Sequence, residues 1–166
     1  MEYKIKKATL EDIPIIQSIA NITFPLTYKD IITPEQNDYM MNMMYSTNSL
    51  TKQMTVEHHT YLICYLDGKP VGYVSVQPID KDVFDLQKIY VLPNHQHQHI
   101  GKYLFEHAVA LIREMHPAPC RMELHVNRYN KALHFYEHIG MHELRQGDYD
   151  IGNGYYMNDY IMGMDL

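Results

Sequence analysis

Hydrophobic and polar positions alternate at the start of the chain and then change to a helical spacing. The alternation from Tyr3 to Ala8 predicts a strand. From Thr9 onward, apolar residues recur every three or four positions, and this predicts a helix that ends near Phe24-Pro25, because the residue before a proline disfavours helix. A second helix is expected to begin at Thr33-Pro34, and a short third helix is expected over Ser49 to Val56.

The rest of the chain carries strand patterns that two helical patterns interrupt. Asp67-Gly68 stands between two apolar runs and predicts a hairpin. The Gly- and Asp-rich segment 147–154 is predicted to be a loop. The predicted strands cover 60–66, 69–76, 83–92, 120–126, 142–146 and 155–164. One later helix is expected to follow the polar loop after residue 92, with a buried face from Tyr103 to Ile112 and an end at Pro117, and another is expected over 131–139.

The order of these elements predicts a mixed sheet with helices on both faces. Strands joined by short turns pair antiparallel, whereas the strand–helix–strand unit from Val83 to Val126 requires a parallel pair. The chain has 166 residues, which fits one domain, and no repeat or linker divides it. We therefore expect a single domain over residues 1–166 with an α/β fold of the mixed-sheet, α+β kind.

Composition narrows the partners and the compartment. Fourteen basic and 20 acidic residues give a formal charge of −6, which argues against nucleic acid as the main partner because phosphate binding needs a basic face. Cys64 and Cys120 each lie in a strand-like apolar run and are expected to be reduced core residues. No apolar run approaches the roughly 20 residues of a membrane span, and the first residues lack the apolar core of a signal peptide. We expect a cytoplasmic protein without a membrane partner.

The polar loop after the strand 83–92 ends at the first turn of a helix. Backbone N–H groups there lack helical partners and lie at the positive end of the helix dipole, so the loop is a ready anion site. The run from His95 to His99 also suggests a metal site, because alternating histidines share a face in an extended segment. A zinc site needs further ligands and a closed geometry, so we expect no metal and favour histidines beside a phosphate group.

Two motifs follow one another in the second half of the chain. The first consists of Val91 and Pro93 followed by Gln96, Ile100 and Gly101, and the second of Asn130, Ala132, Phe135-Tyr136 and Gly140-Met141. With these motifs in this order of elements, nearly the whole chain resembles the Gcn5-related N-acetyltransferases. The resemblance implies the acyl-CoA N-acyltransferase fold, with about seven mostly antiparallel strands, a central parallel pair and about four to five flanking helices.

The resemblance also implies acetyl-CoA as the co-substrate. In this family, loop amides cradle the coenzyme A pyrophosphate and the pantetheine arm pairs with the strand before the loop. The spacing leaves open whether Asn130 or Asn127 makes the contact near the pantetheine. The implied cofactor-binding residues are Ile89, Tyr90, Val91, Gln96, His97, Gln98, His99, Ile100, Gly101, Lys102 and Asn130.

His99 departs from the family pattern, which has glycine at this position. Glycine adopts a positive φ at little cost and lets the backbone approach a phosphate closely. Because the position falls at a helix start, we expect His99 to take an ordinary helical φ and cofactor binding to be retained. The alternative is a sensor or adaptor domain that keeps the fold but binds coenzyme A poorly.

Direct attack of a primary amine on the thioester, in a ternary complex, requires a base, a stabilised oxyanion and an acid for the thiolate. By resemblance, Tyr136 is the acid, and the alternative is a core aromatic residue. Asp85 stands six residues before Val91, where relatives often carry a glutamate that acts as the base directly or through water. Glu123 and His125, on one face of the neighbouring strand, are reserve candidates for the base.

Two variable segments, 23–54 and 147–154, shape the acceptor site in such enzymes. Phe24 and Tyr28 are expected to contact the substrate. Aromatic faces beside carboxylates suit a cationic amine, so we favour a small amine or polyamine as the acceptor. A protein or peptide amine is the alternative, and the sequence leaves open whether the protein is a monomer or a homodimer.

Overall fold

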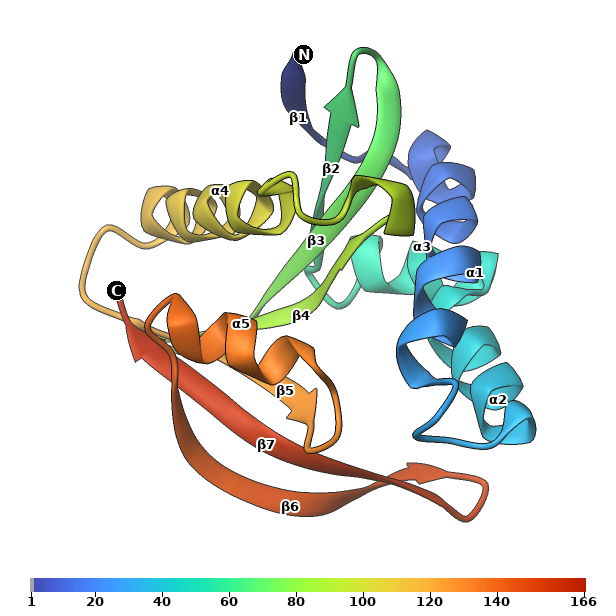
Figure 1. Cartoon of the computed structure of the whole chain (residues 1–166). Coiled ribbons are helices and arrows are strands. Elements are labelled where there is room, and N and C mark those ends of the chain that lie inside the picture. The colour runs from blue at the N-terminus through green and yellow to red at the C-terminus, as the bar shows by residue number, and fades with distance from the viewer. Residues whose placement is uncertain (1) are drawn as a thin grey trace.

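Seven strands form one mixed sheet in the computed structural model, which describes residues 2–166 (Figure 1). Their order is β1-β2-β3-β4-β5-β7-β6, and β4 and β5 are the parallel pair among otherwise antiparallel neighbours in the described chain. The strands are β1 (Tyr3–Lys7), β2 (Thr60–Leu66), β3 (Lys69–Asp80), β4 (Val83–Val91), β5 (Arg121–Asn127), β6 (His142–Gly152) and β7 (Tyr155–Asp165). The helices are α1 (Ile13–Tyr28), α2 (Pro34–Tyr45), α3 (Thr47–Thr55), α4 (Ile100–Met115) and α5 (Ala132–His138), with short 3-10 helices η1 (Leu10–Asp12) and η2 (Pro93–His95). The predicted fold class is confirmed.

The parallel pair diverges along its length. β4 and β5 pair only from Val83 to Asp85 with Arg121 to Glu123, although both strands continue well beyond. A bulge at Gln87, where the β3 register shifts between Ser75 and Val76, accompanies the divergence. After Asp85, the residues of β4 remain paired with β3 along one edge. Along the other edge, which faces β5, their backbone groups have no partner in β5.

Two hydrophobic cores lie on opposite faces of the sheet (Figure 1). On one face α4 and α5 cover a core that includes Leu104 and Ile112. On the other face α1, α2 and α3 cover a core that includes Ile16, Leu50 and Tyr73. Each fully buried large apolar side chain contributes roughly 1.5–3 kcal/mol, so both helical layers are firmly attached to the sheet.

Helix α1 is longer than the sequence pattern predicts, because it continues through Pro25 to Tyr28. A proline inside a helix removes one backbone hydrogen bond and costs about 3 kcal/mol or more. Phe24 and Tyr28 lie on the buried face of this last stretch, with exposures of 1% and 8%. Their packing outweighs the local cost, and the predicted end at Phe24-Pro25 is wrong.

The last hairpin is tighter than predicted. Strand β6 continues to Gly152, and only Asn153-Gly154 forms the turn, with φ values of 54° and 78°. Two consecutive positive φ values give the twist that a two-residue hairpin needs. The predicted hairpin at Asp67-Gly68 is confirmed with the same geometry, at 49° and 82°. The prediction of a loop over 147–154 is wrong, and its Asn-Gly pair is the turn signal.

Candidate functional site

A groove of about 1280 Å³ follows the opening between β4 and β5. It runs from the C-terminal part of α1 past β4 to the first turn of α4, and α5 forms another wall. Gln98 is the one predicted cofactor residue that is not in its wall. The predicted cofactor residues that line it are Ile89, Tyr90, Val91, Gln96, His97, His99, Ile100, Gly101, Lys102 and Asn130.

The loop between β4 and α4 contains two residues with left-handed backbone geometry. His97 has φ 66° and His99 has φ 61°. The expectation of an ordinary helical φ at His99 is therefore wrong: the chain must reverse just before Ile100, and the helix begins only there. A left-handed conformation costs a non-glycine residue roughly 1–2 kcal/mol, so this loop holds its shape against local strain.

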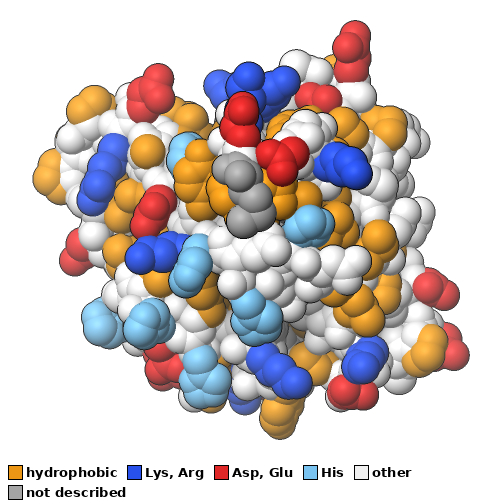
Figure 2. Space-filling model, turned by 45° about the horizontal axis from the view of Figure 1, so that its top comes forward, with side chains coloured by type: hydrophobic (Ala, Val, Ile, Leu, Met, Phe, Trp, Pro, Cys, Tyr) orange, Lys and Arg blue, Asp and Glu red, His pale blue; other side chains and the backbone are white. Residues whose placement is uncertain are grey.

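The first turn of α4 presents free amides to the groove. His99 caps the helix without a side-chain hydrogen bond to it, and Ile100, Gly101 and Lys102 all line the groove. A Cβ added to Gly101 would lie 3.6 Å from Phe135, which is an ordinary contact, so packing inside the chain does not require glycine there. Figure 2 shows histidine side chains gathered with lysine and arginine side chains on one face of the molecule. The arrangement is suited to an anionic group.

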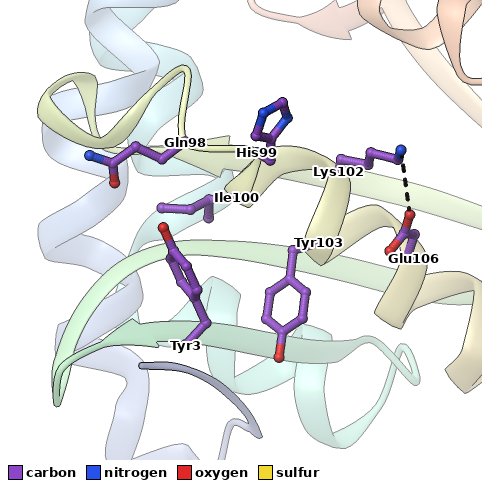
Figure 3. Close-up of a pocket in the computed structure, with 7 residues that line it drawn as sticks. All are labelled: Tyr3, Gln98, His99, Ile100, Lys102, Tyr103 and Glu106. Atoms are coloured by element: carbon purple, nitrogen blue, oxygen red, sulfur yellow. Dashed lines mark ion pairs between the residues drawn. The ribbon is translucent and has the colours of Figure 1, made fainter. Parts of the chain in front are cut away.

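Gln98 faces a smaller cavity of about 310 Å³ beside the same helix start (Figure 3). Tyr3, Tyr103 and Glu106 also line this cavity, and Lys102 pairs with Glu106 at 4.0 Å. The side-chain oxygen of Gln98 is buried without a hydrogen-bond partner among the described residues. His99, Ile100 and Lys102 line both spaces, whereas Gln98 lines only the smaller cavity.

The two asparagines that the sequence could not separate have different positions. Asn130 lines the groove, and its side-chain oxygen accepts a hydrogen bond from the Ala132 amide at 2.9 Å. Asn127 is 3% exposed and accepts a hydrogen bond from the Tyr129 amide at 2.9 Å. The geometry favours Asn130 as the groove residue.

Tyr136 and Tyr28 both line the groove. Burial raises the pKa of Tyr136 well above its usual range, and the nearby Tyr28 adds to the rise. Burial also raises the pKa of Tyr28 to about 12, Asp159 adds to this, and hydrogen bonds with Tyr90 and Asn130 oppose it. Both phenols therefore carry their protons at neutral pH and can donate them.

Phe24 does not reach the groove. It is 1% exposed and packs against Tyr28, with ring centroids 4.7 Å apart. The structure thus places this predicted substrate contact behind Tyr28, because α1 continues past Pro25 and turns Phe24 into the core.

Asp85 is buried at the end of the β4–β5 pairing, with 6% exposure. Burial raises its pKa to about 6; His125 opposes the rise, Glu123 adds to it, and a hydrogen bond from Gln87 opposes it. Gln87 Nε2 donates to Asp85 Oδ2 at 2.6 Å. Asp85 can therefore accept a proton near neutral pH, although it does not line the groove itself.

Glu123, a reserve candidate for the base, is fully engaged. Arg121 lies 2.7 Å from one of its oxygens and Arg145 lies 2.9 Å from the other. Both oxygens of this carboxylate are thus committed to ion pairs with guanidinium groups. The other reserve candidate, His125, lines the groove.

Lys88 is a buried lysine that sequence reasoning missed. Its amine donates to the Tyr61 hydroxyl at 2.7 Å and to the Gln53 side-chain oxygen at 3.1 Å, and it lies 4.3 Å from the centre of the Tyr45 ring. Burial lowers its pKa to about 7, and Glu57 opposes this. Lys88 directly precedes the apolar residues Ile89 to Val91 of β4, and a lysine beside such a run is the signal that could have marked it.

Two carboxylates of the segment 147–154 have partners within the chain. Asp148 pairs with Arg128 at 2.5 Å, and Asp150 accepts a hydrogen bond from the Gly152 amide at 2.8 Å. Within residues 2–166, no cluster of three metal-ligating side chains is present, and no helix is long and apolar enough to cross a membrane. Asp148 is therefore paired with a cation of the chain itself, whereas Asp150 is bound by a neutral backbone amide.

Comparison with known proteins gives a consistent result. The model of the acetyltransferase (GNAT) family matches residues 17–141. Spermidine N(1)-acetyltransferase from Thermoplasma acidophilum is 23% identical over 129 residues, which cover 75% of this chain and 80% of that protein.

Solved structures share the fold. The PaiA N-acetyltransferase from Thermoplasma acidophilum, in complex with coenzyme A, matches with a TM-score of 0.81 and 22% identity over 100% of both chains. The ribosomal-protein-S18-alanine N-acetyltransferase from Escherichia coli matches with a TM-score of 0.74 and 18% identity over 99% of this chain and 94% of that one. At these identities the likeness shows the shared architecture.

Proposed function

Because the chain belongs to the acetyltransferase (GNAT) family, we propose that it transfers the acetyl group of acetyl-CoA to a small cationic amine by direct attack in a ternary complex. The observation that carries this proposal is the continuity of the groove, which joins the free amides of α4, the unpaired edge of β4 and the Tyr136 hydroxyl. A thioester cofactor needs these three features in this order.

The cofactor would lie along the groove from the loop to the sheet. The amides of the first turn of α4 would hold the pyrophosphate, with Gln96, His97 and His99 beside it. The pantetheine arm would pair with the free backbone groups of Ile89, Tyr90 and Val91, and Asn130 would face it across the groove. A backbone amide in the same stretch would stabilise the thioester oxygen as charge develops on it.

The proposed acid and base come from different elements, Tyr136 from α5 and Asp85 from β4. Tyr136, which lines the groove and keeps its proton at neutral pH, would protonate the departing thiolate. Asp85, whose pKa is about 6, would receive the proton of the acceptor ammonium. Because Asp85 does not line the groove, this proton must pass through an intermediate group or water.

Two features support a small acceptor rather than a polypeptide. Helix α2 contacts the β6–β7 hairpin: the Tyr39 hydroxyl donates to the Ile151 carbonyl at 2.6 Å, and Gln36 donates to the Tyr156 carbonyl at 3.3 Å. Figure 1 shows α2 beside the β6–β7 hairpin. This contact narrows the space in which a polypeptide substrate could pass between the two elements to reach the acceptor site. The similarity to a spermidine acetyltransferase also favours a polyamine.

Calorimetry and a turnover screen test the proposal. Acetyl-CoA should bind, and thiol release should be measured with diamines, polyamines, amino acids, amino sugars and peptides. A diamine should exceed the monoamine of equal length by at least about tenfold in kcat/KM, equivalent to about 1.4 kcal/mol from the second charge. Turnover of peptides alone would select the protein-amine alternative, and no binding at millimolar acetyl-CoA would contradict the enzyme proposal.

A further inference from the structure

Three ionisable side chains from adjacent strands lie on one face of the sheet, beside the end of the groove. Asp85 of β4 is paired with Glu123 of β5, and Asn127 of β5 is paired with Asp159 of β7. Side chains two and four residues apart on a strand share a face, and so do directly paired residues. Asp85, His125 and Asp159 therefore share one face, with His125 on the middle strand.

Of these three side chains, the imidazole is the one that lines the groove. The His125 side chain is 45% exposed, the Asp159 side chain is 10% exposed, and 3.5 Å separate His125 Nδ1 from Asp159 Oδ2. Tyr149 meets the imidazole edge-on, with centroids 5.1 Å apart. A carboxylate at Nδ1 favours the tautomer that carries its proton there, which leaves Nε2 free to accept a proton.

The negative charge around this imidazole is not neutralised elsewhere. Asp85 Oδ1 and Asp159 Oδ1 are both buried, and neither has a hydrogen-bond partner among the described residues. Glu123 on the same face is instead bound by two arginines, one of which is Arg145. A cation that forms on His125 would therefore be stabilised by two aspartates, neither of which is paired with an arginine or a lysine among the described residues.

The electrostatics of His125 agree with this geometry. The hydrogen bond with Asp159 raises its pKa above the ordinary value and burial opposes this, while the charges of Asp85 and Asp159 add to the rise and Arg145 opposes it. Glu123, two residues before His125 on β5, is held by the arginines, and Tyr149 of β6 packs edge-on against the ring. The net effect favours the imidazolium.

From this arrangement we propose that His125 is the group that takes the proton from the acceptor ammonium, and that Asp159 is its positioning residue. The inference rests on the proposed function and names the intermediate that Asp85 requires. His125 Nε2 accepts one proton from the ammonium, and the freed amine lone pair attacks the thioester carbon. The C–N bond forms and the C–S bond breaks. The thiolate takes the proton of Tyr136, which regains one from the second N–H. His125 passes its proton to Asp85, and Asp85 releases it to solvent.

The test measures kcat and kcat/KM against pH for the best amine of the turnover screen, in the full-length protein. His125→Asn should lower kcat about 100-fold or more, as expected for loss of a general base, with unchanged acetyl-CoA affinity. Asp159→Asn should move the acid limb of the kcat/KM profile to lower pH, because the lost charge no longer favours the imidazolium. An NMR titration of the His125 ring should shift in the same direction.

Matched controls separate this role from a structural one. His142→Asn and Asp165→Asn change the same residue types on exposed parts of β6 and β7 and should leave kcat and the acid limb unchanged. If wild-type protein turns over an amine but His125→Asn stays within about threefold, or Asp159→Asn leaves the limb in place, the relay is wrong and the proposed function stands. If no amine is turned over, both fail.

Discussion

His99 is held in a left-handed conformation that most residues avoid, with φ 61°. Glycine pays no steric penalty there, so His99→Gly should raise the free energy of unfolding by about 1 kcal/mol despite the entropy that glycine adds to the unfolded chain. Urea denaturation measures this. His134→Gly, inside α5, is the control of opposite sign and should destabilise by about 1 kcal/mol.

The same variant distinguishes an enzyme from a sensor. The loop already has the left-handed turn with histidine in place, so His99→Gly should change the acetyl-CoA affinity by less than about threefold. Calorimetry on the wild-type and variant proteins makes the comparison. A gain of more than about tenfold would identify His99 as a block to binding and would support the sensor alternative.

Tyr136 is the residue whose replacement should separate chemistry from binding. Tyr136 is buried and lines the groove, so Tyr136→Phe keeps the ring in its site and removes only the hydroxyl. We expect kcat to fall about 100-fold, while the Kd for acetyl-CoA changes less than about threefold. Phe135→Leu, next to it, is the control for packing on α5. Unchanged turnover in Tyr136→Phe would return the residue to a purely structural role.

Lys88 predicts how stability depends on pH. Its pKa is about 7 in the folded protein and about 10.4 in an unfolded chain, so the unfolded state binds more protons between these values. The free energy of unfolding should therefore rise with pH from about 7 to about 10, by up to about 1.4 kcal/mol per pH unit from this group.

Urea denaturation between pH 6 and pH 10 checks the sign. Lys88→Met keeps the length of the side chain and should remove most of this rise, whereas Lys102→Met, at a side chain that is 60% exposed, should leave it intact. If the free energy of unfolding rises equally with pH in the wild-type protein and in Lys88→Met, the Lys88 amine is charged in the folded protein and the prediction is wrong.

At the scale of elements, the contact between α2 and the β6–β7 hairpin depends on a glycine. A Cβ on Gly152 would lie within van der Waals overlap of the Tyr39 hydroxyl, and the residue has φ 92°. Gly154, with φ 78°, has open space around its Cβ position. Both alanine variants carry the backbone strain of a positive φ, and Gly152→Ala adds the overlap with Tyr39. Gly152→Ala should therefore destabilise the fold by about 1–3 kcal/mol more than Gly154→Ala does.

A double-mutant cycle measures that difference directly. If the Tyr39 hydroxyl causes the excess cost, Tyr39→Ala should reduce the penalty of Gly152→Ala to that of Gly154→Ala in thermal or urea denaturation. An excess that persists without the Tyr39 side chain would place the strain in the hairpin backbone alone.

The elements that sequence predicts well are those whose signals are local. The Asp67-Gly68 turn, the capped start of α2 at Thr33 and the alternating strands need only neighbouring residues. The end of α1 fails because burial of Phe24 and Tyr28, which depends on the distant sheet, outweighs the proline. The β6–β7 hairpin could have been predicted from the sequence, since its Asn153-Gly154 turn is a local signal.

The site divides in the same way. Motif spacing brings nearly all the predicted cofactor residues to one groove, because they lie on one continuous strand–loop–helix segment. The pairing of His125 with Asp159 joins β5 to β7 and has no sequence signal. The left-handed φ of His99 is also set by the loop as a whole, which must reverse before α4.

At the scale of the whole molecule, a ligand that binds only the folded chain should stabilise all of it. If residues 1–166 form one cooperative domain, acetyl-CoA at 100 times its Kd should raise the free energy of a single unfolding transition by about 2.7 kcal/mol. Gly101→Glu should abolish this increment, because it places a negative side chain at the helix start that faces the groove. Gly101→Ala is the matched control, since its Cβ makes only an ordinary contact with Phe135 and the fold tolerates it. An equal increment in Gly101→Glu would show that the cofactor does not bind at this helix start. Two separate unfolding transitions would show that residues 1–166 do not form one cooperative domain.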